Sequence, residues 1–144
     1  MAETVVVSAC LAGISCRYDG GDSLNAELME SLSDSTIVPL CPEQLGGLPT
    51  PRQPSEICGG TGKEVLSGKA SVISSEGDDL TESFIRGAKE GLKIVKLSVA
   101  KRVFLKEKSP SCGVAQIKRG GITIEGSGVF AALLKMEGMK ITGI

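Results

Sequence analysis

The stretch Leu105-Lys-Glu-Lys-Ser-Pro-Ser-Cys-Gly113 decides the fold that we expect for this chain. A short apolar run from Arg102 to Leu105 leads into it and is typical of a buried strand. The Ser-Pro-Ser turn then presents Cys112 just past the end of that strand. The expected unit is therefore a strand that ends in a turn bearing a thiol.

The same unit occurs twice more in the first third of the chain. Val5-Val-Val-Ser-Ala9 leads into Cys10, and Ile37-Val-Pro-Leu40 leads into Cys41. The carboxyl ends of parallel strands share one edge of an open sheet, and ligand sites form at that edge. We therefore expect three cysteines that are distant in the sequence to meet there, which favours a metal or cluster site over a structural role.

Strands and helices alternate along the rest of the chain. We expect strands at residues 4–9, 36–40, 70–74, 102–106 and 139–143, and a hairpin of residues 114–117 and 121–125. Helices are expected from a cap at Asp22 or Ser23 to Leu32, over residues 80–99, and from Gly128 to Gly138. This alternation predicts one α/β domain, residues 1–144, as a Rossmann-like sandwich with a mainly parallel central sheet and helices on both faces.

The helix over residues 80–99 carries two further signals. Asp79-Leu-Thr-Glu82 resembles a capping box with Asp in place of Ser or Thr. Gly87 and Gly91 lack a side chain on the inner face of the helix, so we expect them to allow a close approach to the sheet.

Residues 41–68 are rich in Gly and Pro and show little hydrophobic periodicity. An irregular segment of this length inside a compact domain is usually functional or disordered. Because the segment starts at Cys41-Pro-Glu43, we interpret it as functional.

Two glycine-rich segments match nucleotide-binding motifs only in part. Gly59-Gly-Thr-Gly-Lys63 lacks the first Gly and the final Ser or Thr of a P-loop, so we interpret it as a plain loop. Gly126-x-Gly128-x-x-Ala131 follows a strand and opens a helix, but the chain ends before an acidic residue about 20 positions later can occupy a second strand. We expect a tight turn there, with a helix N-terminus that faces the active edge.

The composition narrows the range of partners. The 144 residues have a formal net charge of −1, and the basic residues form no long run, so stable binding of nucleic acid is not expected. No apolar run approaches the roughly 20 residues that a membrane span requires. We expect a cytosolic protein that acts on a small molecule; the sequence leaves the oligomeric state open.

The chain has five cysteines and no histidine. The missing histidine excludes Cys-His and Ser-His nucleophile pairs and His-ligated zinc sites. Reduced cytosolic thiols without a C-x-x-C pair, three of them after strands, suit an iron–sulfur cluster with one open iron, or less well a three-thiolate zinc site. Cys16 and Cys58 lie in expected loops and are interpreted as spare or structural.

Carboxylates and hydroxyls near the three cysteines are the candidate catalytic groups. Glu43 follows Cys41 by two residues, which places its carboxylate near the expected metal, and in a chain without histidine we favour it as general acid and base. Ser109 and Ser111 flank Pro110 beside Cys112, and at least one hydroxyl is expected to face the same pocket. The candidate anchors for an anionic or carbonyl-bearing substrate are Arg17, Arg52 and Lys106.

Several motifs together resemble the thiouracil desulfidase family, long catalogued as a domain of unknown function. They are Ser8-Ala-Cys-Leu-Ala-Gly13, Cys16-Arg-Tyr-Asp-Gly20, Cys41-Pro-Glu43, Gly46-Gly-Leu-Pro-Thr-Pro-Arg52, Lys106-x-x-Ser-Pro-Ser-Cys-Gly113, Gly126-x-Gly-Val129 and Ala131-Ala-Leu-Leu134. The resemblance runs from about residue 5 to the C-terminus. The chain departs from the family at Ile117-Lys-Arg-Gly-Gly121, where relatives often have an Ile-Tyr-Asp-Gly-like turn, and at Phe130, where they tend to have Thr.

The resemblance implies an oxygen-sensitive 4Fe–4S cluster that only three cysteines hold, and non-redox removal of sulfur from a thiolated pyrimidine. Carried over by motif, Cys10, Cys41 and Cys112 are the implied ligands. The implied catalytic pair is Glu43 and a serine of the Ser-Pro-Ser turn. The resemblance favours Ser109 over Ser111 as that serine. Our hypothesis is that the open iron binds the sulfur of the substrate while Glu43 activates the attacking water.

Three other hypotheses stay open at this point. The chain could be a non-catalytic metal-binding or redox-sensing thiol domain, a cluster-dependent hydratase, or a desulfidase that acts on thiolated nucleosides in transfer RNA. The metal content of anaerobically purified protein separates the first from the others, and sulfide release separates desulfuration from hydration.

Overall fold

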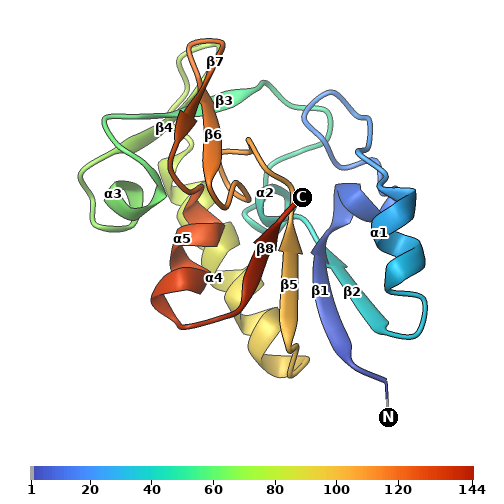
Figure 1. Ribbon diagram of the computed structural model, residues 1–144. Helices are drawn as coiled ribbons and strands as arrows, with labels where there is room; N and C mark the ends of the chain where they lie inside the picture. Colours follow the sequence, from blue (N-terminus) through green and yellow to red (C-terminus); the bar gives the residue numbers. More distant parts are fainter. Residues whose placement is uncertain (1) are drawn as a thin grey trace.

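A four-stranded parallel sheet forms the centre of the computed structural model, which describes residues 2–144 (Figure 1). The strand order is β2-β1-β5-β8, and all three neighbouring pairs are parallel. The four strands are β1 (Thr4–Ser8), β2 (Thr36–Leu40), β5 (Arg102–Leu105) and β8 (Ile141–Gly143). The Rossmann-like α/β architecture and the strands expected in these regions are confirmed.

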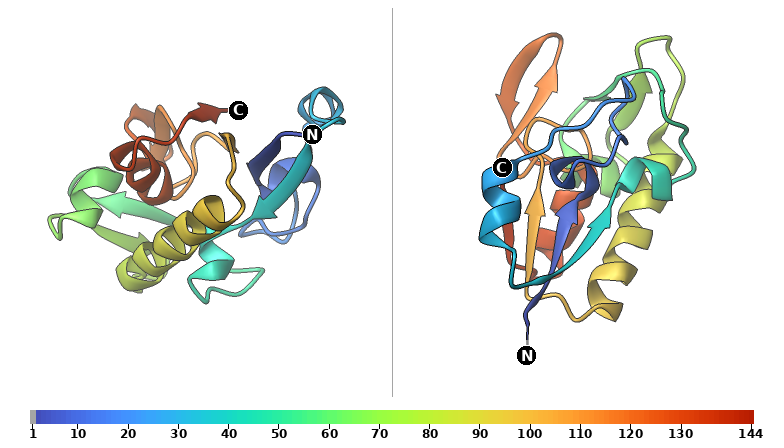
Figure 2. Two further views of the ribbon diagram at one scale, coloured as in Figure 1. Left: turned by 90° about the horizontal axis from the view of Figure 1, so that it is seen from below. Right: turned by 90° about the vertical axis from the view of Figure 1, so that its right-hand side faces the viewer.

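Helices cover both faces of this sheet. The long helix α4 (Thr81–Leu97) and helix α5 (Val129–Met136) lie on one face, and the short helix α1 (Ala26–Ser31) lies on the other (Figure 2). Successive side chains of β1 alternate between the two layers, because Val6 belongs to the core under α4 and α5 while Val5 and Val7 pack with Leu32. Burial on both faces explains the unbroken valine run of β1.

Helix α1 begins later than the sequence indicates. Its N-cap is Asn25, whose side-chain oxygen accepts a hydrogen bond from the Leu28 amide at 2.9 Å, so the expected cap at Asp22 or Ser23 is wrong. Asp22 instead accepts the Leu24 amide at 2.8 Å, which closes a local turn ahead of the helix. Leu24 is consequently 57% exposed, whereas Leu32 is buried.

The segment of residues 41–68 is more regular than expected. It contains helix α2 (Pro42–Leu45), strand β3 (Ser55–Cys58) and helix α3 (Gly62–Leu66), and β3 pairs antiparallel with β4 (Ser71–Ser74). The plain loop predicted at residues 59–63 is also wrong, since Thr61 and Glu64 form a capping box that opens α3. Elements this short carry too few residues for hydrophobic periodicity to reveal them.

Helix α4 packs against α2, the helix that directly follows β2. A Cβ atom added at Gly87 would lie only 1.9 Å from the Pro42 carbonyl oxygen, so this glycine allows α4 to pack against α2 rather than against the sheet. Gly91 faces the Phe130 ring of α5. The expected capping box at Asp79 does not form, because Asp79 accepts the Thr81 amide and the N-cap residue is Leu80. No helix within residues 2–144 is both long and apolar enough to cross a membrane.

The expected hairpin consists of β6 (Gln116–Arg119) and β7 (Ile122–Glu125), joined by Gly120 and Gly121. Arg119 donates from Nε to the Ile57 carbonyl oxygen at 2.9 Å, which fastens the hairpin to β3. Gly138 follows α5 with φ 73°, which agrees with its predicted place as the C′ residue.

Candidate active site

The strand order creates a crevice at one edge of the central sheet. From β1 the chain continues to β2 on one side, whereas β5 pairs with β1 on the other side, so the strand order reverses between β1 and β5. Ligands of open α/β sheets bind beyond the carboxyl ends of the strands at such a reversal. A cavity of about 370 Å³ lies there, and its lining includes residues that follow β1, β2 and β5.

Three of the five cysteines line this cavity from the three strands that the sequence singled out. Cys10 lies in a short 3₁₀ turn (Ala9–Ala12) directly after β1, Cys41 is the N-cap residue of α2 directly after β2, and Cys112 lies in the loop after β5. They share one cavity, yet no three potential ligands within the described part of the chain are placed to hold a single metal ion.

A fourth thiol, Cys16, belongs to the same cavity. It is 2% exposed, and its backbone carbonyl oxygen accepts the Cys41 thiol at 3.8 Å. Hydrogen bonding by the Cys16 thiol toward Cys10 and Cys41 raises the pKa of Cys16, lowers the pKa of Cys10 to about 7 and lowers the pKa of Cys41. The place of Cys16 at the cavity was not predicted, because this residue lies in a loop and no strand leads into it. Cys58 is exposed at the end of β3 and does not line the cavity.

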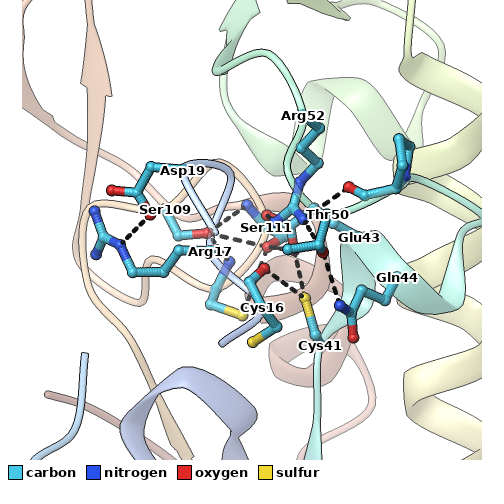
Figure 3. A network of polar contacts seen from close by, with 12 residues as sticks. Cys16, Arg17, Asp19, Cys41, Glu43, Gln44, Thr50, Arg52, Ser109 and Ser111 are labelled. Atoms are coloured by element: carbon cyan, nitrogen blue, oxygen red, sulfur yellow. Dashed lines mark hydrogen bonds and ion pairs between the residues drawn. The ribbon is translucent and has the colours of Figure 1, made fainter. Parts of the chain in front are cut away.

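Glu43 places a buried carboxylate at the cavity wall. Its side chain is 11% exposed, and its Oε1 accepts a hydrogen bond from the Ser111 hydroxyl at 2.7 Å. The Arg52 guanidinium lies 3.8 Å from Oε2, and the Cys41 sulfur lies 3.9 Å from Oε1 (Figure 3). A hydroxyl, a guanidinium and a thiol thus fix the direction in which the carboxylate points.

Both serines of the Ser-Pro-Ser turn take part in this network, in different ways. Ser109 lines the cavity, and its Oγ accepts the backbone N–H groups of Ser111 and Cys112 at 3.2 and 3.1 Å. The two hydroxyl oxygens are 3.0 Å apart, and since Ser111 donates its proton to Glu43, Ser109 donates to Ser111. A chain of hydrogen bonds therefore runs from Ser109 through Ser111 to Glu43.

The turn that bears Cys112 is held by the start of α5. The backbone N–H groups of Val129 and Phe130 donate to the carbonyl oxygens of Pro110 and Ser111 at 2.8 and 2.9 Å. The N-terminus of α5 thus faces the active edge, as expected, but it binds the turn itself. The turn encloses Cys112, and burial together with the Glu43 carboxylate raises the pKa of that thiol.

All three predicted substrate anchors line the cavity, and each already has a partner in the protein. Arg17 donates to the Ser23 hydroxyl at 2.7 Å and lies 3.5 Å from Asp19. Lys106 donates to the Glu107 carbonyl oxygen at 3.2 Å, and Arg52 donates to Thr50 Oγ1 at 3.1 Å while it faces Glu43. Arg52 is therefore placed to pair with the Glu43 carboxylate more directly than to bind a ligand.

Comparison with known proteins agrees with this geometry. The family model described as 2-thiouracil desulfurase matches residues 5–143. The uncharacterized protein YbbK of Bacillus subtilis (strain 168) is 45% identical over 140 residues, which cover 95% of this chain and 93% of YbbK. The solved structure of the [4Fe-4S]-dependent thiouracil desulfidase TudS superposes with a TM-score of 0.82 at 35% identity, over 98% of this chain and 90% of TudS. The chain therefore belongs to the 2-thiouracil desulfurase family.

Proposed function

We propose that this protein removes the sulfur atom of a small thiolated pyrimidine such as thiouracil and replaces it with oxygen. The reaction converts C=S and water to C=O and hydrosulfide, so the ring carbon keeps its oxidation state and no electron acceptor is needed. Family membership and the similarity to TudS support this reaction. The observation that carries the proposal is the meeting of three strand-end thiols and a buried carboxylate in one cavity.

The residues of the cavity fit an iron–sulfur cluster. Thiolates are the usual ligands of such clusters, and Cys10, Cys41 and Cys112 supply three of them from separate loops. A cluster is larger than one ion, so its ligands need not converge on a single point. We assign these three cysteines as the ligands of a 4Fe–4S cluster, which leaves one iron without a protein ligand.

Such a cluster supplies a soft Lewis acid toward the sulfur of the substrate when it is bound. Glu43 is the general base, and it removes a proton from the water that attacks the ring carbon. Its position suits this role because Ser111 and Arg52 hold the carboxylate from two sides at the wall of the cavity. After the C–S bond breaks, the proton on Glu43 is available to the departing sulfide.

The two serines keep the base in place. Ser111 is 1% exposed and donates directly to Glu43, so it fixes the orientation of the carboxylate. Ser109 lines the cavity and donates to Ser111, which places its hydroxyl beside the volume that the substrate and the water would fill. Ser109 is thus the serine that reaches the reactants, and Ser111 acts through Glu43.

The test is anaerobic reconstitution followed by turnover of 2-thiouracil, with sulfide release as the readout. We expect about four irons and four sulfides per chain and stoichiometric formation of uracil and hydrosulfide. Glu43→Gln keeps the size of the side chain but removes the base, so the rate should fall about 10²- to 10⁴-fold with the cluster intact. Zinc in place of iron would support a non-catalytic thiol domain instead, and an unchanged rate in Glu43→Gln would refute the assignment of the base.

A further inference from the structure

Aromatic side chains are scarce in this protein, and only one of them reaches the cavity. The chain has no Trp, one Tyr and three Phe. Phe84, Phe104 and Phe130 are buried in the core at 2%, 7% and 0% exposure, whereas Tyr18 lines the cavity and is 42% exposed. Any planar ring that enters the cavity therefore has one aromatic side chain to stack on.

The loop of Tyr18 is held in place by backbone hydrogen bonds. The Tyr18 carbonyl oxygen accepts the Arg52 backbone N–H at 2.8 Å, which ties the loop to the residue that faces Glu43. Gly20 and Arg17 close a turn around Tyr18 by a backbone hydrogen bond of 2.9 Å.

One side of the Tyr18 ring already has a partner. The Arg17 guanidinium lies 5.6 Å from the centre of the ring, at a distance typical of a cation–π contact. Arg17 is itself fixed by Ser23 and Asp19. A restrained cation thus lies over one face of the ring, which limits the motion of the ring and lowers the entropic cost of holding it against a ligand.

We propose that Tyr18 stacks on the pyrimidine ring of the substrate and so directs its thiocarbonyl group toward the thiols and Glu43. This inference rests on the proposed function, since it takes the substrate to be a flat heteroaromatic ring. Stacking between a base and an aromatic side chain tolerates different ring substituents, because every pyrimidine presents a π face. Tyr18 therefore sets the plane of the ring, and the polar groups deeper in the cavity select the edge that reacts.

The experiment measures both binding and turnover, in the reconstituted parent protein, Tyr18→Leu and Tyr18→Phe. Equilibrium dialysis with uracil reports binding without any chemical step, and steady-state kinetics with 2-thiouracil report KM and kcat. Loss of one base–aromatic stack should raise the Kd for uracil and the KM about 5- to 100-fold in Tyr18→Leu. The kcat should change less than the KM does, and Tyr18→Phe, which keeps the ring, should recover most of the lost affinity.

The outcomes distinguish a failure of the proposed Tyr18 stacking from a failure of the proposed desulfuration. Tyr18→Leu that binds uracil within about twofold of the parent overturns the proposal. The proposal is also overturned if Tyr18→Phe binds uracil as weakly as Tyr18→Leu, because the hydroxyl would then be the contact. It is likewise overturned if the parent protein binds no uracil. A parent that binds uracil through Tyr18 but releases no sulfide from 2-thiouracil would leave the stack supported and would refute only the proposed reaction.

Discussion

Gly87→Ala tests whether the packing of α4 against α2 positions the Glu43 carboxylate, which we propose as the general base. A Cβ atom at position 87 would lie 1.9 Å from the Pro42 carbonyl oxygen, whereas real contacts of this kind stay above 3.0 Å, so the two helices must separate by about 1.1 Å. The obstacle is backbone, which cannot rotate away as a flexible side chain can. Glu43 is the next residue of α2 and must move with Pro42.

The expected stability change combines two opposing effects. Overpacking costs about 1–3 kcal/mol, and the better helix propensity of Ala over Gly offsets about 1 kcal/mol of this. Because the clash is with backbone, we expect a net loss of about 2 kcal/mol and a fall in Tm of about 4–8 °C. A displacement of about 1 Å at a catalytic group can reduce the rate about 10²-fold, so turnover of 2-thiouracil should fall further than stability alone explains.

The assay is thermal unfolding followed by circular dichroism, paired with sulfide release from 2-thiouracil at a temperature where both proteins are folded. Lys89→Ala is the matched control, since it introduces the same residue on the exposed side of the same helix and should shift stability by less than about 0.5 kcal/mol. If Gly87→Ala has the same Tm as the parent protein and desulfurates 2-thiouracil at the parental rate, the contact between α4 and α2 does not set the position of Glu43.

Three further predictions concern single side chains. Ser111→Ala removes a hydrogen bond to a buried carboxylate, worth about 1.5–3 kcal/mol, so kcat should fall about 10- to 100-fold at unchanged iron content, and an unaltered kcat would contradict the assigned role. Asn25→Ala removes the N-cap of α1 and should lower the Tm by about 2–4 °C; calorimetry that shows no shift would mean that the cap contributes nothing. Cys16→Ser should keep the parental iron content, because Cys16 lies beside the assigned ligands without being one of them, and loss of iron in this variant would make it a ligand.

The sequence predicted the core of the fold where its patterns are long or repeated. The valine run of β1 identified a strand buried on both faces, and the alternation of strands and helices identified the parallel sheet. The prediction failed where local polar contacts decide the structure. Asn25 rather than Asp22 caps α1 because the Asp22 carboxylate is used in a turn, and that choice depends on where the chain lies in three dimensions.

In the candidate site, too, sequence patterns predicted the position of some residues, whereas the position of others depends on contacts in three dimensions. A thiol after each of three strands was visible in the sequence, and parallel strands bring such positions to one edge. Cys16 was missed because a loop residue has no periodicity to place it, and its contacts with Cys10 and Cys41 arise only when the loop folds over the cavity. The pairing of Arg52 with Glu43 likewise joins residues whose contact no spacing rule predicts.

The most direct test of the central claim is the iron content of a cysteine series, measured on anaerobically reconstituted protein. Cys58→Ser serves as the control, because Cys58 is exposed and lies away from the cavity. We expect about four irons per chain in the parent and in Cys58→Ser, and loss of most of that iron in each of Cys10→Ser, Cys41→Ser and Cys112→Ser. Full iron content in any one of those three variants would contradict the assignment of that cysteine, and with it the three-thiolate site on which the proposed desulfuration depends.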